Sequence, residues 1–375
     1  MTTAYRVLAR KYRPQTFAEL IGQETMVRTL SNAIATGRVA HAFVLTGVRG
    51  VGKTTTARII ARALNCVDGP TTEPCGECAH CRAIADDNHT DVVEVDAASH
   101  TGVDDVRDLV DGTRYRPVSA RYKIYIVDEV HMLSKNAFNA LLKTLEEPPA
   151  DVVFVFATTE PNRIPVTVLS RCQRFSLRRV PLDQLTAHYG RVSEAEGIAV
   201  APAALGLIAR AADGSVRDGL SLFDQAIALS GGAVVEEAAV RDMLGIADRS
   251  LVFDLLETVL RGDAAGALDR MTSLYRDGAD PSMVLQDLLD LTHLLTRLRL
   301  ADDPAETSER VRSLAATLSM PVLTRAWQML LKGIEEAQVA PSPIQAAEMV
   351  LIRLTYAADL PSPAELVRAL TRNAA

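Results

Sequence analysis

A glycine-rich octet near the N-terminus carries the residue types that bind phosphate. Residues 47–54 read Gly-Val-Arg-Gly-Val-Gly-Lys-Thr, which fits the pattern of glycine, four residues, glycine, lysine and threonine. In such a loop, backbone N–H groups and the positive end of a helix dipole surround one point. Lys53 would reach the β- and γ-phosphates of a nucleotide, and the Thr54 hydroxyl would hold Mg²⁺. The residues expected to contact the nucleotide are Gly47, Val48, Arg49, Gly50, Val51, Gly52, Lys53, Thr54 and Thr55.

Polar side chains also follow two later apolar runs of strand type. Residues 123–128 end in Asp128, and Glu129 comes next. Asp128 is placed to bind Mg²⁺, and Glu129 to polarise a water for attack on the γ-phosphate. Thr158 and Thr159 follow another such run and are expected near the γ-phosphate, because ligands bind at the carboxyl ends of parallel strands.

The elements that would position these groups alternate between strand and helix. Helical patterns cover residues 55–64, 103–113 and 134–146, with Ser134 as the N-cap of the last. Strands are expected at residues 41–46, 92–96, 123–128, 152–157 and 174–177. This alternation predicts a three-layer α/β domain over residues 1–180, with a parallel sheet of five strands.

Four of the five cysteines are clustered with spacings of eight, two and two residues. Four thiolates at such spacings suit tetrahedral Zn²⁺, and the site would have no open position for catalysis. An iron–sulfur cluster is the alternative, and disulfides are disfavoured in a reducing compartment. His80 is interpreted as a neighbour of the site and Cys172 as a small buried apolar residue. The expected ligands are Cys66, Cys75, Cys78 and Cys81.

Composition and charge narrow the class of protein. The chain has 375 residues and a net charge of −7, but residues 1–65 carry +8, which leaves −15 for the remainder. A basic segment around a phosphate loop is expected for nucleotide binding alone, so it is weak evidence for nucleic acid. Aromatic residues make up only 5%, which disfavours recognition by base stacking. Because neither a membrane helix nor a secretion signal is recognisable, a cytoplasmic protein with no membrane partner is expected.

The remaining chain is patterned as helices throughout. Residues 181–246 are expected to form a small helical lid, and residues 247–375 an all-helical domain. In the latter, Asp280 and Pro281 open a leucine-rich helix in the manner of an N-cap followed by proline. A later helix carries Trp327, and another follows Pro343. The apolar stripes of these helices are interpreted as core first and interface second.

Several motifs together resemble the clamp-loader branch of the AAA+ ATPases, and within it the gamma/tau family of bacterial DNA polymerase III. The cysteine insertion after the phosphate-loop helix strengthens the resemblance. The other motifs are Tyr12-Arg-Pro-x-x-Phe17, Ile21-Gly-Gln23, Asp128-Glu-Val-His131, the Leu-Leu-Lys-Thr-Leu-Glu-Glu-Pro-Pro run at residues 141–149, Ser170-Arg171-Cys172 and Gly214-Ser-Val-Arg217-Asp218.

The resemblance implies roles for further residues. Thr159 would be the first sensor of the γ-phosphate, with Thr158 as the weaker choice. Arg171 would be a finger that enters the ATP site of the neighbouring subunit, and Arg217 a second sensor that reads the γ-phosphate of its own subunit. The last helical domain would be the collar through which subunits oligomerise. The adenine and ribose would be bordered by Tyr12, Arg13, Pro14, Ile21 and Gly22.

The function implied by this resemblance is ATP-driven loading of a sliding clamp onto primed DNA for DNA polymerase III. The expected cofactors are ATP, Mg²⁺ and Zn²⁺. The expected partners are the delta and delta-prime subunits, further copies of the chain, the beta clamp, primer–template DNA and, through an extension beyond these residues, the polymerase III core. Two alternatives stay open. A helicase would unwind duplexes in proportion to ATP consumed, whereas a non-catalytic nucleotide-binding scaffold would not hydrolyse ATP.

Overall fold

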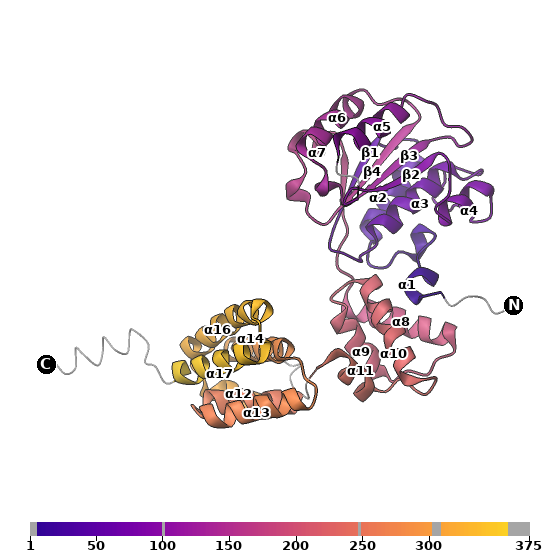
Figure 1. The fold of residues 1–375 in the computed structure, drawn as a ribbon. Coiled ribbons are helices and arrows are strands. Elements are labelled where there is room, and N and C mark those ends of the chain that lie inside the picture. Colours follow the sequence, from indigo (N-terminus) through magenta and orange to yellow (C-terminus); the bar gives the residue numbers. More distant parts are fainter. Residues whose placement is uncertain (1–5, 100–101, 247–248, 302–308, 359–375) are drawn as a thin grey trace. The chain divides into compact units, whose positions relative to one another are not determined.

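The computed structural model describes residues 6–99, 102–246, 249–301 and 309–358. They form two compact units, Met1–Glu237 and Ala238–Ala375, whose elements are labelled in Figure 1. Within the described ranges, no helix has both the length and the apolar character needed to span a bilayer.

The first unit is built on a five-stranded, all-parallel sheet. The strands lie in the spatial order β2-β3-β4-β1-β5, so the predicted parallel sheet is confirmed, and each strand boundary falls within one residue of its predicted position. Their bounds are β1 Ala42–Thr46, β2 Val92–Asp96, β3 Lys123–Asp128, β4 Val152–Thr158 and β5 Gln173–Ser176. Because all five run the same way, their carboxyl ends meet at one edge of the sheet.

Helices cover both faces of this sheet (Figure 1). Alternate residues of β1 point to opposite faces, with Phe43 in one apolar core and Val44 in the other. The helices of the first core are α2 Glu24–Ala35 and α3 Lys53–Asn65, and those of the second are α5 Val103–Gly112 and α6 Lys135–Glu146. Ser134 caps α6 as predicted, since its hydroxyl accepts the Ala137 N–H at 3.2 Å.

Helix α3 begins two residues earlier than the apolar pattern predicts. The pattern indicates a start at Thr55, but the first helical residue is Lys53. Gly52 precedes it in the left-handed region, with φ 102°. The glycine therefore turns the chain directly into the helix, and Lys53 and Thr54 lie in its first turn.

Short elements join the main layers. They are α1 Leu8–Lys11, α4 Ala79–Ala85 and α7 Val166–Leu169, with 3₁₀ turns at Phe17–Glu19, Val130–Met132 and Pro161–Arg163. None of these was anticipated, because each is too short to show a helical period.

Four helices follow the sheet. They are α8 Leu182–Glu196, α9 Pro202–Ala211, α10 Val216–Ser230 and α11 Glu237–Leu244. The Ser215 hydroxyl caps α10 by accepting the Asp218 N–H at 3.2 Å. Asp224 of α10 accepts the backbone N–H of Leu8 at 2.7 Å, so this helix also holds the N-terminal segment.

The second unit consists entirely of helices over its described residues. After α11, which lies in this unit from Ala238 onward, the helices are α12 Arg249–Leu260, α13 Ala264–Arg276, α14 Pro281–Leu300, α15 Glu309–Thr317, α16 Met320–Val339 and α17 Pro343–Ala358. Asp280 caps α14 and Pro281 is its first residue, as predicted. Leu288 and Leu295 of the leucine stripe are fully buried, whereas Trp327 of α16 stays 37% exposed.

Candidate functional site

A cavity of about 350 Å³ lies at the carboxyl edge of the sheet. The structure brings most of the predicted nucleotide-site residues together on its walls. Those lining it are Tyr12, Arg13, Pro14, Ile21, Arg49, Gly50, Val51, Gly52, Lys53, Thr54, Thr55, Asp128, Glu129 and Arg217. Gly22, Gly47, Val48, Thr159 and Arg171 are not among the lining residues.

The glycines of the phosphate loop allow a backbone path that other residues would strain. Gly50 has φ 76°, in the left-handed region. A Cβ atom there would lie 1.9 Å from the Ser215 hydroxyl oxygen. The loop therefore packs directly against the start of α10, and the backbone N–H of Arg217 donates to the Gly50 carbonyl at 3.3 Å.

Lys53 is held inside the loop. Its side chain is 6% exposed, and its Nζ donates to the carbonyls of Gly47 at 3.0 Å and Val48 at 3.1 Å. Burial lowers the pKa of Lys53, while Glu129 and Asp128 raise it. The ammonium is thus a partly desolvated donor beside two carboxylates, placed to exchange carbonyl partners for a phosphate.

The two oxygen ligands expected for Mg²⁺ lie in direct contact. The Thr54 hydroxyl donates to Asp128 Oδ2 at 2.6 Å. A hydroxyl and a carboxylate are the oxygen donors that Mg²⁺ prefers near phosphates. The residues present therefore fit a magnesium ion.

Glu129 adopts a strained backbone conformation, with φ 45°. Its carboxylate accepts the Thr159 hydroxyl at 3.1 Å and the Thr159 N–H at 3.3 Å. Thr158 is fully buried, and its hydroxyl pairs with the His131 ring at 3.0 Å. Thr159 is thus hydrogen-bonded to Glu129 whereas the Thr158 hydroxyl bonds to His131, which favours Thr159 as the residue that orients this carboxylate.

The N-terminal segment is tied to the lid helix α8. The Tyr12 hydroxyl donates to Glu196 Oε1 at 2.5 Å, and Lys11 pairs with the same carboxylate at 2.6 Å. Burial and Glu196 raise the pKa of Tyr12 to about 12. These contacts fix the tyrosine ring at the cavity wall.

Six further lining residues were missed by the sequence reasoning. The sequence did contain a signal for Asp96, because this residue ends a run of strand type just as Asp128 does. In the sheet the two residues lie side by side. No local signal marks His188, whose Nε2 is buried without a hydrogen-bond partner among the described residues. Burial, and then Arg191, lowers the pKa of His188 to about 4. The six are Ala9, Leu20, Asp96, His188, Val216 and Leu220.

Arg171 lies in the turn between α7 and β5. Its guanidinium donates to the Thr167 carbonyl at 2.7 Å and pairs with Glu146 at the end of α6. It is 32% exposed. The side chain is therefore held at the surface, away from this chain's own cavity.

The cysteine cluster follows α3 directly, since Cys66 is the C-cap of that helix. The four Sγ atoms lie within 4.8 Å of one another. The Sγ atoms of Cys66 and Cys75 are 3.6 Å apart, close to the edge of about 3.8 Å of a tetrahedron with Zn–S bonds of about 2.3 Å. The backbone N–H of Cys81 donates to the Cys78 sulfur at 3.3 Å. This geometry fits a tetrahedral metal ion.

His80 and Cys172, neither of which was expected to bind the metal, have different surroundings. His80 is half-buried and pairs with His89 at 2.9 Å, and it is not part of the group of converging sulfurs. Cys172 is half-buried and packs against an apolar core. Burial raises its pKa to about 12, so it is an unreactive thiol.

Models of three protein families match successive parts of the chain. One described as the DNA polymerase III delta subunit matches residues 22–181. One described as the ATPase lid domain of the DNA polymerase III clamp loader subunit matches residues 184–232. One described as domain III of DNA polymerase III subunits gamma and tau matches residues 235–370.

Curated relatives match over nearly the whole chain. DNA polymerase III subunit gamma of Buchnera aphidicola is 38% identical and covers 94% of this chain and 99% of its own length. The chain belongs to the gamma/tau family. Subunit tau of Salmonella typhimurium is 44% identical over 96% of this chain, and subunit tau of Bacillus subtilis 37% identical over 96%. The chain spans 57% and 65% of the lengths of these two.

Family membership and geometry agree on the fold class. A phosphate loop after β1, a five-stranded parallel sheet and a matched ATPase lid are the parts of an AAA+ domain. An all-helical region typical of gamma/tau domain III follows. The predicted AAA+ fold class is therefore confirmed.

Proposed function

We propose that this chain is the ATPase subunit of a sliding-clamp loader that serves DNA polymerase III. The observation that carries the proposal is the wall of the cavity at the sheet edge. There the phosphate loop, the Thr54–Asp128 pair and Glu129 converge with Arg217. Each is a group that phosphoryl transfer to water requires, in a chain of the gamma/tau family.

In this proposal different residues of the chain bind the triphosphate and assist its hydrolysis. Loop N–H groups and Lys53 hold the β- and γ-phosphates, and the wall of Tyr12, Pro14 and Ile21 receives the base. Glu129, oriented by Thr159, takes a proton from the attacking water. A magnesium ion bound by Thr54 and Asp128 would neutralise charge on the phosphates. Arg217 would contact the γ-phosphate and so couple nucleotide binding to the position of the lid helix α10.

Arg171 is proposed to act on the neighbouring subunit. It projects from the α7–β5 turn and lies outside its own cavity. A guanidinium supplied by a neighbour can stabilise the charge of the transition state. Its present partner, Glu146, would be exchanged for phosphate when subunits assemble.

The proposed partners are other clamp-loader subunits and further copies of this chain, together with the clamp and primed DNA. Nucleotide at each subunit boundary would order the assembly, and hydrolysis would release the clamp. Contacts to DNA would be mainly to phosphates and largely independent of sequence. Clamp and DNA must then affect nucleotide binding as strongly as nucleotide affects theirs.

We also propose that the cysteine cluster holds a structural zinc ion. All four positions are thiolates, so no coordination site is left for a substrate. Metal analysis of the purified chain should find one zinc per chain, and iron with inorganic sulfide instead would contradict this assignment.

The test of the function is ATP hydrolysis by the reconstituted loader with Arg171→Ala. We expect clamp- and DNA-stimulated hydrolysis to fall about 10³-fold, the low end for a finger supplied by a neighbour. ATP binding by the isolated chain should stay within about twofold, because the residue lies outside the cavity. Arg163→Ala is the matched control, since this exposed arginine pairs with Glu160 in a nearby turn.

If Arg171→Ala hydrolyses ATP at the normal clamp- and DNA-stimulated rate, Arg171 does not act as a finger in the neighbouring site. Absence of hydrolysis in the unmodified assembly would instead indicate a nucleotide-binding scaffold. Unwinding of duplex DNA in proportion to ATP consumed would indicate a helicase.

A further inference from the structure

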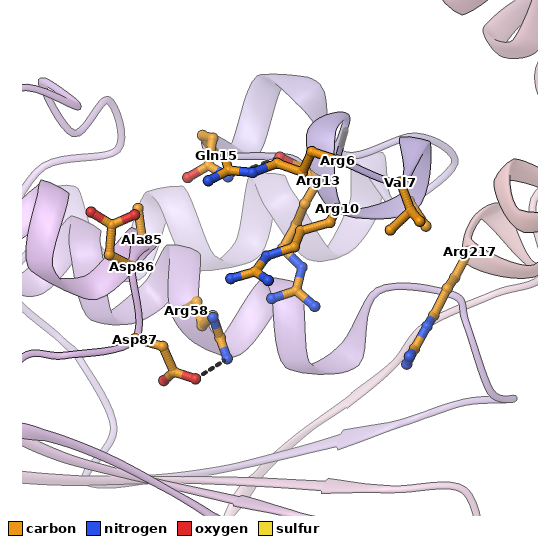
Figure 2. Close-up of a pocket in the computed structure, with 11 residues that line it drawn as sticks. Arg6, Val7, Arg10, Arg13, Gln15, Arg58, Ala85, Asp86, Asp87 and Arg217 are labelled. Carbon is orange, nitrogen blue, oxygen red and sulfur yellow. Dashed lines mark hydrogen bonds and ion pairs between the residues drawn. The ribbon is translucent and has the colours of Figure 1, made fainter. Parts of the chain in front are cut away.

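A second cavity, of about 540 Å³, lies beside the nucleotide cavity in the first unit. Figure 2 shows the side chains that line it. We call it the arginine pocket, after its five arginines. They are Arg6, Arg10, Arg13, Arg58 and Arg217.

The arginines come from separate parts of the chain. Arg10 lies in α1, Arg58 in α3 and Arg217 in α10. Asp86 and Asp87, which follow α4, form one side of the pocket, opposite Arg217 in Figure 2. Four segments that are distant in the sequence thus meet at one cavity.

The charges of this pocket are poorly balanced. Arg58 pairs with Glu94 at 2.7 Å and with Asp87 at 3.0 Å. No carboxylate of the described residues forms an ion pair with Arg6, Arg10, Arg13 or Arg217. Burial lowers the pKa of Arg13, and so do the neighbouring Arg58 and Arg217, while Glu94 and Asp87 act against this lowering. Such like-charge crowding is relieved when an anion binds among the guanidinium groups.

We propose that the arginine pocket binds a compact oligophosphate anion, at a site distinct from that of the nucleotide held by the phosphate loop. Guanidinium groups present a planar fork of donors that matches phosphate oxygens. Four unpaired guanidiniums call for a ligand with several negative charges, and the cavity is large enough for more than one phosphate group.

The carboxylates on the wall restrict the shape of the ligand. A nucleic-acid strand carries a regularly repeated charge, and its backbone would run on past Asp86 and Asp87 at the side of the pocket. A short chain of phosphates can remain among the arginines and avoid this repulsion. The pocket therefore suits a small anion better than a polymer.

The site is coupled to the nucleotide cavity through shared residues. Arg13 and Arg217 line both cavities, so ligands in the two compete for two guanidiniums and repel each other. Each ligand should therefore weaken the other by the same factor. We expect about fivefold, the low end of typical coupling between sites. An oligophosphate would then act as an inhibitor of nucleotide binding.

The experiment measures binding of inorganic tripolyphosphate to the full chain by calorimetry, with saturating Mg-ADP to fill the phosphate loop. Arg10→Ala removes a guanidinium that lines only the arginine pocket. We expect its Kd for tripolyphosphate to rise about tenfold, as for a lost charge-assisted hydrogen bond, with its Kd for ADP unchanged. Arg38→Ala, an exposed arginine that lines neither cavity, should bind both ligands as the unmodified chain does.

Three results would overturn the proposal: no binding of tripolyphosphate once ADP is saturating, an unchanged Kd in Arg10→Ala, or tighter binding of a short single-stranded oligonucleotide at the same site. Should Arg10→Ala fail to fold, Arg6→Ala replaces it. If the chain binds no ADP, the proposed ATPase function fails, and the titration is repeated in Lys53→Met. Loss of tripolyphosphate binding on adding Arg10→Ala to Lys53→Met would still support the arginine pocket.

Discussion

The nucleotide cavity and the arginine pocket share two arginines but obtain their charge in different ways. The first relies on consecutive residues of one loop, with Lys53 balanced by Asp128 and Glu129. The second has side-chain cations from separate segments, and only Arg58 is paired there among the described residues. A loop motif thus builds a site that is nearly neutral before its ligand arrives. A pocket assembled by tertiary structure can instead retain uncompensated charge.

The largest effect should come from a residue of the nucleotide cavity alone. Lys53→Met keeps much of the side-chain volume but removes the ammonium. We expect ATP affinity to fall about 100-fold, because a charge-assisted hydrogen bond to phosphate contributes about 2–3 kcal/mol. Nucleotide titration of the isolated chain measures this. Tripolyphosphate binding in the arginine pocket should be unaffected, and a parallel loss there would show that the two cavities are one site.

A residue common to both cavities should have a smaller effect on each. Arg217→Ala is expected to weaken ATP and tripolyphosphate about tenfold each, since one charged hydrogen-bond donor is lost from both. Arg217→Lys keeps the charge without the fork and should recover part of each loss. The measurement is calorimetry with each ligand in turn. A loss confined to one ligand would show that Arg217 serves a single cavity.

The smallest effect concerns acid sensitivity at the wall of the nucleotide cavity. Burial, and then Arg191, depresses the pKa of His188 to about 4 in the folded chain, against about 6.5 when unfolded. The unfolded chain therefore binds the proton more readily, so the stability from the neutral ring is present above about pH 6.5 and is lost as the pH falls towards 4.

His188→Gln removes this titration. Between pH 7 and pH 5 the unmodified chain should lose about 1 kcal/mol more free energy of unfolding than the variant, after allowance for solvent screening. Urea midpoints at both pH values measure the difference. His293→Gln, at an exposed position in α14, should behave like the unmodified chain. Equal losses in the unmodified chain and His188→Gln would contradict the buried neutral ring.

The sheet was predictable because its central strands are short apolar runs that are buried on both faces. β1 and β4 are fully buried along their length, so their composition alone marks them. Helices α8 to α11 also lie in the stretch that was expected to be helical, residues 181–246. In contrast, α1 has only four residues and shows no period. Such elements are set by contacts with distant parts of the chain, as Leu8 is by Asp224.

The residues of the site divide in the same way, into those marked by local sequence patterns and those brought together by tertiary packing. Lys53, Thr54 and Asp128 belong to local patterns, and the structure places them on one cavity wall. His188 reaches that wall only because tertiary structure brings α8 to the cavity, and no spacing along the chain encodes that approach. The arginine pocket was missed for this reason, although the excess of basic residues in the first 65 positions pointed to the same region.

The backbone at Glu129 carries a consequence for engineering. Its φ of 45° is a conformation that costs a non-glycine residue about 1–2 kcal/mol. Selection for thermal tolerance alone would therefore favour glycine or asparagine at this position. Such a variant would be more stable but would lack the proposed proton acceptor. Screens for stable forms of this chain therefore need to monitor ATP turnover as well as melting temperature.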